Sequence, residues 1–227
     1  MSPAARLIAK PLVFAACLLP ALKLGAGAFN LADWSLGADP VAALLHTCGR
    51  WTLNFLLITL CMTPLQDFTG WNHWLRFRRM FGLFAFFYLL MHFSVFVLLD
   101  QAGKLPAIGH EIVKRPYITL GMLGLCLLIP LALTSTAKAQ RRMGRRWTRL
   151  HQLIYPAALL GVWHFWWGVK KDIRLPLLYA CGLALLLGYR LWKRHRFALP
   201  FSVARSAGTD GVSAAAPPCS ANPCTDR

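Results

Sequence analysis

Two histidines, His92 and His164, lie inside long apolar segments and are the side chains best suited to chemistry in this sequence. His92 follows Arg79 by 13 residues, and His164 follows Arg149 by 15 residues. If both segments are helical, these spacings put the two imidazoles about 20–22 Å from a basic segment, and so at a similar depth. An ionisable side chain at bilayer depth is costly and indicates a functional site. Two imidazoles on neighbouring helices form the ligand set of a six-coordinate haem iron.

A third histidine, His151, begins the same apolar segment as His164, 13 residues earlier. That spacing is about 20 Å of helix and turns the side chains roughly 140° apart, although Pro156 between them is expected to kink the helix. His151 lies close to Arg149 and therefore near the cytoplasmic face. It is a candidate ligand of a second electron carrier on that side, or a gate for electrons that reach it. Arg79, not histidine, stands at the matching depth of the third segment. For each of these histidines, helix packing or an interhelical hydrogen bond remains the alternative.

Other polar residues are assigned no catalytic chemistry. The sequence has no phosphate-binding loop, nucleophile elbow or zinc helix, and its eight acidic residues are scattered. His46 is given a structural role, with a cofactor or quinone site as the alternative. His73, His110 and His195 fall in loops or in the basic tail. Small residues are expected to leave flat space for a porphyrin or to allow close helix packing, and they are Gly82, Gly121, Gly124, Gly161 and Gly168.

The composition predicts a membrane protein. Of the 227 residues, 57% are hydrophobic and 15% charged, whereas soluble domains have about 45–50% apolar and about 25% charged residues. Apolar segments near 20 residues match the thickness of a bilayer, and they must be helical because lipid leaves strand edges unpaired. We therefore predict an all-α membrane protein with a six-transmembrane-helix bundle, spanning about 11–29, 41–62, 81–99, 117–136, 150–169 and 175–192.

Basic residues determine the predicted orientation. The formal net charge is +17, which is compatible with nucleic-acid binding, but the lysines and arginines cluster in connections between apolar segments. The positive-inside rule then places both termini in the cytoplasm, against the mild contrary charge of Lys170, Lys171 and Arg174. No nucleic-acid partner is expected, and the cluster from Arg141 to Arg149 suits anionic membrane lipid or an anionic flavin donor.

Two segments lie at the edges of the predicted membrane domain, which covers residues 1–200. The first apolar segment resembles a signal peptide, but its cleavage would leave five spans and break the charge pattern, so an uncleaved helix is preferred. Residues 201–227 are rich in Ala, Ser, Pro and Gly, and are predicted to form a disordered cytoplasmic tail.

Between Leu36 and Trp192 the sequence resembles the MsrQ (YedZ) family, the haem-binding membrane subunits of periplasmic methionine sulfoxide reductase systems. The wider group is that of ferric-reductase-like transmembrane domains. Short motifs in matching order carry the resemblance. They are Gly37-Ala38-Asp39-Pro40-Val41, His46 with Gly49-Arg50, Arg78-Arg79-Met80-Phe81-Gly82-Leu83, Arg115-Pro116-Tyr117-Ile118-Thr119-Leu120-Gly121, Leu133-Thr134-Ser135-Thr136, and Leu150-His151 with Tyr155 and His164.

The resemblance implies a b-type cytochrome of the bacterial inner membrane with one or two haems. It would take electrons from the quinone pool or a flavin reductase and pass them to MsrP, a periplasmic molybdopterin reductase that repairs oxidised proteins. The family's haem-related histidines carry onto His92, His151 and His164. FMN is also implied, without residues to hold it. Such a chain is an electron-transfer subunit, and its partner is expected to dock near loops 30–40 and 100–116.

Two other functions remain possible from sequence. A transmembrane ferric reductase would deliver electrons to metal chelates outside the cell. A non-redox transporter or assembly protein would use the same membrane histidines to relay protons or to bind a substrate.

Overall fold

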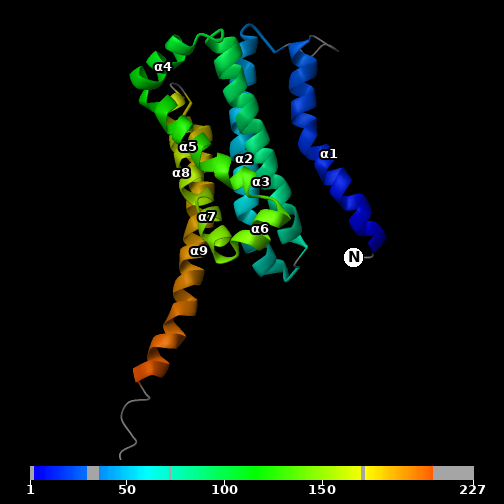
Figure 1. Cartoon of the computed structure of the whole chain (residues 1–227), viewed down its shortest axis with the longest axis vertical. Coiled ribbons are helices and arrows are strands. Elements are labelled where there is room, and N and C mark those ends of the chain that lie inside the picture. Colours follow the sequence, from blue (N-terminus) through cyan, green and yellow to red (C-terminus); the bar gives the residue numbers. More distant parts are fainter. Residues whose placement is uncertain (1–2, 30–35, 72, 170–171, 207–227) are drawn as a thin grey trace, which may run out of the picture. The chain divides into compact units, whose positions relative to one another are not determined.

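All the regular structure in the described part of the chain is helical, as the apolar segments predict (Figure 1). The structure is a computed structural model and describes residues 3–29, 36–71, 73–169 and 172–206. The chain divides into two units, residues 1–187 and 188–227. All the membrane histidines lie in the first unit.

The predicted apolar segments correspond to six of the helices. These are α1 (Pro3–Ala28), α2 (Pro40–Thr69), α3 (Trp74–Val95), α5 (Pro116–Leu133), α8 (Ile154–Gly168) and α9 (Arg174–Ser206). The connections form shorter helices, namely α4 (Leu105–Lys114), α6 (Ala137–Met143) and α7 (Arg145–His151). A π-helical turn, η1 (Phe96–Asp100), continues α3 toward α4.

Local sequence signals explain where the site-bearing helices begin and end. Asp39 caps α2 by accepting a hydrogen bond from the backbone N–H of Ala42 at 3.0 Å, and Pro40 occupies the first turn. The helix ends at Gly70, whose φ of +70° is the left-handed conformation of a C-cap. Pro116 likewise begins α5. These caps fix the length of α2 and the start of α5, both of which contact the histidines.

Among the described residues, five helices are long and apolar enough to cross a membrane: α1, α2, α3 with η1, α5 and α9 up to Arg196. The chain is therefore a multi-pass membrane protein. The predicted segment 150–169 is interrupted at Gln152 and Leu153, so α8 has 15 residues and a length of only about 22 Å. Pro156 explains the interruption, because it has no N–H to donate to the carbonyl of Gln152. The helix thus breaks one turn before Pro156.

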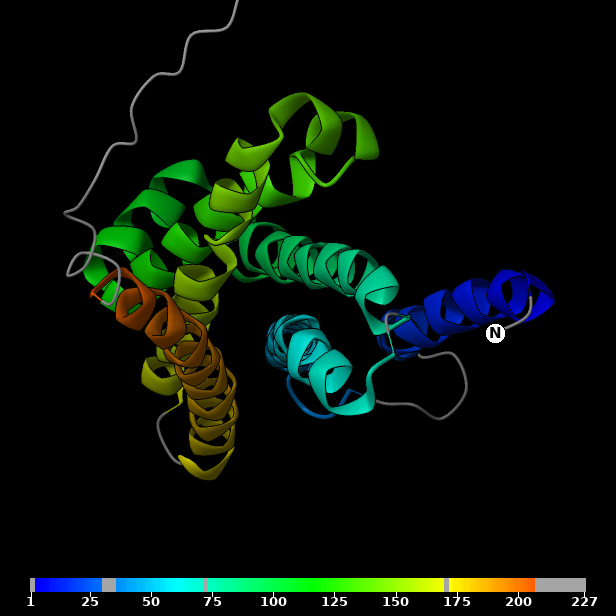
Figure 2. The same cartoon turned by 90° about the horizontal axis from the view of Figure 1, so that it is seen from below.

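The first unit is built from two closely packed helix pairs, α2 with α3 and α5 with α8 (Figures 1 and 2). Fewer contacts join the pairs, through α2 with α8 and α3 with α5. Ala85, Ala157 and Ala158 are almost completely buried, which lets the helices approach closely. Phe55 of α2 stacks on Tyr88 of α3 with ring centroids 5.4 Å apart. The looser boundary between the pairs is where His92 and His164 meet.

Tyr88 also attaches α1 to this core. Its hydroxyl donates to the carbonyl of Cys17 and accepts from the N–H of Ala21, both at 2.9 Å. In a regular helix Cys17 and Ala21 would bond to each other. Pro20, next to Ala21, has no N–H to donate to the carbonyl of Ala16 and disturbs the helix at this turn, where the Tyr88 hydroxyl bonds to the backbone.

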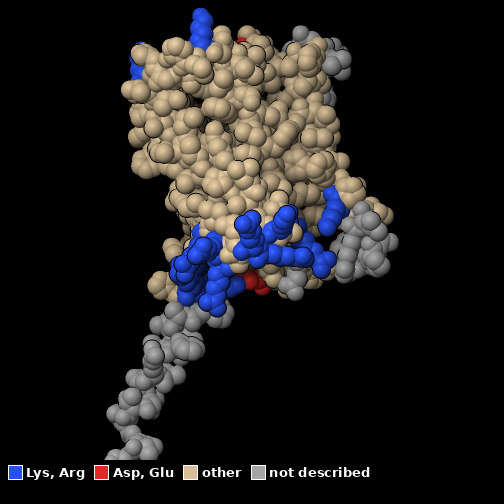
Figure 3. Space-filling model, viewed as in Figure 1, with Lys and Arg blue, Asp and Glu red and all other residues tan. Residues whose placement is uncertain are grey.

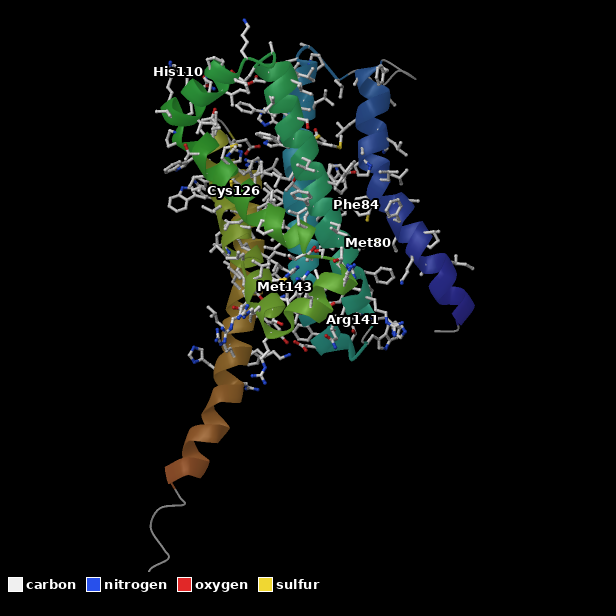
Figure 4. The ribbon with its side chains drawn as sticks, viewed as in Figure 1. Met80, Phe84, His110, Cys126, Arg141 and Met143 are labelled. Carbon is white, nitrogen blue, oxygen red and sulfur yellow. The ribbon has the colours of Figure 1, made fainter. Side chains whose placement is uncertain are left out.

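Charge separates the two ends of the first unit. Lysine and arginine side chains gather at the end that carries α6, as the space-filling view shows (Figure 3). Arg141 lies at this end and His110 of α4 at the opposite end (Figure 4). Large apolar side chains cover the outer surface between the ends, as expected of lipid-facing helices. Trp163, Trp166 and Trp167 of α8 are partly exposed on that surface.

The second unit contains the remainder of α9, which continues to Ser206. The guanidinium of Arg196 lies 4.4 Å from the ring centroid of Trp192, a cation–π contact. The predicted disordered tail begins at residue 201, but residues 207–227 of it lie outside the described residues.

Candidate functional site

The structure brings His92 of α3 and His164 of α8 together. Their ring centroids are 6.1 Å apart and their planes lie at 85° to each other. Both side chains are partly buried. The similar depth that their spacing predicts is therefore accompanied by close proximity of the two rings.

Each imidazole is oriented by a backbone carbonyl from a neighbouring helix. The Nδ1 atom of His92 lies 2.9 Å from the carbonyl oxygen of Leu45 in α2. The Nδ1 atom of His164 lies 2.6 Å from the carbonyl oxygen of Tyr117 in α5. Because a carbonyl oxygen only accepts, Nδ1 must carry the proton in both rings. The Nε2 atom of each neutral imidazole then keeps its lone pair for a metal, the arrangement usual in metal-ligating histidines.

Glycines leave the space that each ring occupies. A Cβ atom on Gly49 of α2 would lie 3.2 Å from Nδ1 of His92. A Cβ atom on Gly121 of α5 would lie 3.0 Å from Nδ1 of His164. Both separations are tighter than an ordinary carbon contact, so any larger residue would displace the imidazole. The two rings thus sit in matching cradles, each made of one glycine and one carbonyl.

The dimensions of the pair agree with those required by a haem iron. A metal–imidazole bond is about 2 Å long and the ring centroid lies about 1.2 Å behind the nitrogen, so two opposed ligands place their centroids about 6.4 Å apart. The observed 6.1 Å is close to this value. No group of three or more His, Cys, Asp or Glu with metal-binding geometry occurs among the described residues. The pair therefore suits a metal that brings most of its own ligands, as haem iron does.

His151 lies apart from this pair, at the C-terminal end of α7. Its ring stacks on Trp147 with centroids 3.8 Å apart, and its Nδ1 is 3.1 Å from the Trp147 carbonyl oxygen. Its Nε2 is buried and makes no hydrogen bond of good geometry to the described residues, although the backbone of Leu131 is near enough to interact with the ring. Burial lowers the pKa of His151 and the nearby positive charge of Arg78 acts in the same direction, so the imidazole is neutral near pH 7.

Trp147 fixes the position of the His151 ring. The indole Nε1 of Trp147 donates to the carbonyl of Thr134 at 2.9 Å, which ties α7 to the last turn of α5. The Trp147 ring covers one face of the imidazole. His151 therefore presents a neutral, buried nitrogen, although the ring stacked on it is an indole and not a second histidine.

The remaining predicted residues have other surroundings. His46 and His110 are exposed on α2 and α4, and His195 is exposed on α9. Of the glycines expected to make room for a porphyrin, Gly121 contacts a histidine. Gly161 would instead press on Leu53 at 3.1 Å, and a Cβ atom on Gly168 would meet open space.

Sequence reasoning missed the contribution of α2. Gly49 and the carbonyl of Leu45 enclose His92, yet neither was singled out for this role. A signal was present, since Gly49 follows Leu45 by one helical turn and both then share a face. The carbonyl partner itself has no signature in the sequence, because every residue has the same backbone carbonyl oxygen, whatever its side chain.

Comparisons with known proteins agree with this architecture. Residues 48–162 match the family described as "Ferric reductase like transmembrane component". A relative from Xanthomonas oryzae pv. oryzae (strain MAFF 311018) is 52% identical over 193 residues, covering 83% of this chain and 88% of the relative. A relative from Xanthomonas campestris pv. campestris (strain 8004) is 53% identical over 189 residues, or 82% and 87% of the two chains.

A more distant relative from Azospira oryzae is 46% identical over 194 residues, covering 85% of this chain and 82% of the relative. All three relatives carry the name "Protein-methionine-sulfoxide reductase heme-binding subunit MsrQ". Similarity at this level over more than four fifths of the sequence is decisive for family membership. The chain belongs to the MsrQ family of ferric-reductase-like membrane proteins.

Proposed function

We propose that this chain is the haem-binding membrane subunit of a methionine sulfoxide reductase system, with His92 and His164 as axial ligands of a b-type haem. The observation that carries the proposal is the approach of the two imidazoles to 6.1 Å between centroids. The names of the relatives support the same function. As an electron-transfer subunit, the chain would conduct electrons to a catalytic partner without itself reducing the sulfoxide.

The residues of the chain have simple tasks in this function. Bound haem supplies one-electron transfer between ferric and ferrous iron. His92 and His164 would hold the cofactor through Nε2, because the carbonyls of Leu45 and Tyr117 keep both rings in the neutral tautomer that leaves Nε2 free. The surrounding apolar helices exclude water, which limits the reorganisation that accompanies a change of charge.

Electrons would cross the inner membrane from the basic end of the first unit to the end that carries α4. We place the basic end in the cytoplasm, with six spans and both termini inside, because lysine and arginine favour that side. The donor is the quinone pool or a cytoplasmic flavin reductase. The recipient is a periplasmic molybdopterin reductase of the MsrP type, docking near α4 and its flanking residues 100–116.

His151 is proposed as a ligand of a second, inner carrier near the basic end. The support is its buried Nε2, which makes no hydrogen bond of good geometry to the described residues, and its neutral imidazole. A second haem and FMN are the candidate carriers that the family resemblance implies. We assign no residues to FMN.

Absorption spectra of the purified full-length chain test the haem proposal. We expect a Soret band that shifts on reduction with dithionite in the unaltered protein. His92→Ala and His164→Ala should each lose the low-spin spectrum of two imidazole ligands. His110→Ala, at an exposed histidine on α4, is the matched control and should keep it. Unchanged spectra in both membrane variants would remove the ligand assignment.

Electron delivery separates the proposed function from a ferric reductase, an alternative favoured by the family match at residues 48–162. The reduced chain is mixed with a purified MsrP-type reductase and methionine sulfoxide, or with a ferric chelate. We expect rapid reoxidation only with the sulfoxide reductase and its substrate. Reoxidation by the chelate alone would favour the ferric reductase.

A further inference from the structure

Arg50 of α2 is a charged side chain at the level of the histidine pair. It follows Gly49, which lies against His92, and it stands 10 residues, or about 15 Å of helix, after Pro40. Its helix is one of those long and apolar enough to cross a membrane. A guanidinium keeps its charge at any physiological pH, so deprotonation cannot remove the free-energy cost of placing this charge inside the bilayer.

Within the described residues, Arg50 forms no ion pair. Its hydrogen bond goes to the hydroxyl of Thr47, 3.2 Å from Nη2 and one turn earlier on the same helix. Arg115 and Glu111 form an ion pair, but both lie far along the sequence from Arg50. A neutral hydroxyl does not neutralise a cation in a medium of low dielectric constant. The position therefore favours an anion that the protein chain itself does not provide there.

A second donor lies one turn further along α2. The hydroxyl of Tyr179 in α9 donates to Oδ1 of Asn54 at 2.7 Å, which fixes the orientation of the amide. The Nδ2 atom of Asn54 then remains as a donor. Residues 50 and 54 share a face of the helix, and Tyr179 is within electrostatic reach of Arg50. Guanidinium and amide donors together form the type of site that binds a carboxylate.

The same cluster adjoins His164. Tyr179 packs edge-on against Phe165, with centroids 5.6 Å apart, and Phe165 follows His164 in α8. Arg50 is thus the chain neighbour of the glycine that meets His92, and Asn54 is linked through Tyr179 to the chain neighbour of His164. Haem b has two propionate carboxylates on one edge, and a haem held by these histidines would have to find partners for both.

We propose that Arg50, supported by Asn54, binds a propionate carboxylate of the haem held by His92 and His164. This inference rests on the proposed function, because it assumes that the pair holds haem. Arg50 is a positioning residue that orients the porphyrin edge and balances its charge. The alternative source of an anion is the phosphate of a lipid headgroup reached by the exposed side chain.

The test compares haem b with its dimethyl ester, in which both carboxylates are blocked. Apoprotein is prepared in a maltoside detergent, which contains no phosphate, and is titrated with each compound. We expect Arg50→Gln to weaken binding of haem b about tenfold, the size typical of one charge-assisted contact. Binding of the ester should be equally weak in the unaltered protein and in Arg50→Gln.

Two further variants make the result specific. Arg50→Lys keeps the charge without the planar fork and should fall between the unaltered protein and Arg50→Gln. Arg76→Gln removes the same charge from an exposed position at the start of α3 and should bind haem b normally. The midpoint potential of bound haem b should fall in Arg50→Gln, because a nearby cation favours the ferrous state, and should be unchanged in Arg76→Gln.

The possible failures are distinguishable. An equal loss for haem b and for its ester in Arg50→Gln would show that Arg50 acts on the fold and not on a carboxylate. An effect that appears only after phospholipid is added would assign Arg50 to lipid phosphate. Either result overturns this inference but leaves the histidine pair intact. If the unaltered chain bound neither compound, the proposed function itself would fail.

Discussion

The backbone of Gly121 lies directly against the imidazole of His164, and a Cβ atom added there would be 3.0 Å from Nδ1. The same ring is held at 2.6 Å by the carbonyl of Tyr117, four residues earlier in α5. One turn of α5 therefore supplies both the space for the imidazole and the acceptor that orients it. An analogous turn of α2, from Leu45 to Gly49, does the same for His92.

This relationship predicts the effect of enlarging Gly121. We expect Gly121→Ala to displace the His164 ring by a few tenths of an ångström and to weaken haem retention roughly tenfold, as loss of a ligand's supporting contact does. Haem per chain after gel filtration measures the effect. Gly124→Ala is the matched control, since its new Cβ atom would meet Leu160 at an ordinary 4.0 Å. Equal haem retention in Gly121→Ala and Gly124→Ala would show that the space at Gly121 is not needed to position the His164 ring.

The separate position of His151 predicts a different phenotype. We expect His151→Phe to keep the absorption of the His92–His164 site, because the Trp147 stack and apolar burial tolerate an aromatic ring. It should remove the second component from a redox titration, because the buried Nε2 is lost. Spectroelectrochemistry of both proteins measures this. A single component in the unaltered protein would show that His151 holds no second redox centre.

The Tyr88 hydroxyl predicts how α1 is attached. Tyr88→Phe leaves the aromatic packing intact but removes the partner of Cys17 and Ala21, so we expect unfolding in detergent to become easier by about 1–3 kcal/mol. Protease cleavage within α1 should become faster. Tyr117→Phe is the control, because that hydroxyl contacts the exposed Arg115. Identical stability in both variants would mean that the hydroxyl does not secure α1.

The distribution of charge predicts the orientation in the membrane. With all seven native cysteines replaced by serine or alanine, single cysteines are introduced by His110→Cys and Arg141→Cys at exposed positions of opposite ends. In intact cells, a membrane-impermeant maleimide should label the first variant and should label the second only after permeabilisation. The reverse pattern would invert the proposed topology.

The sequence by itself determined the helical membrane class, the apolar segments and the similar depth of His92 and His164. These follow from local quantities, namely hydrophobic length and the rise per residue of a helix. It also pointed to Pro156 as the residue that disturbs the fifth segment, although it predicted a kink in one continuous helix and the structure has two helices there. The lysines and arginines between the apolar segments predicted the orientation of the chain in the membrane, and this prediction needs no information about helix packing.

Only the tertiary structure decided what surrounds the histidines. Which carbonyl accepts from Nδ1, and which glycine opens space for a ring, depends on the rotation and offset of one helix against another. Gly49 and Leu45 lie more than 40 residues before His92, and no local pattern links them to it. The helices α4, α6 and α7 were likewise not predicted, because short connecting helices gain their stability from tertiary contacts more than from propensity.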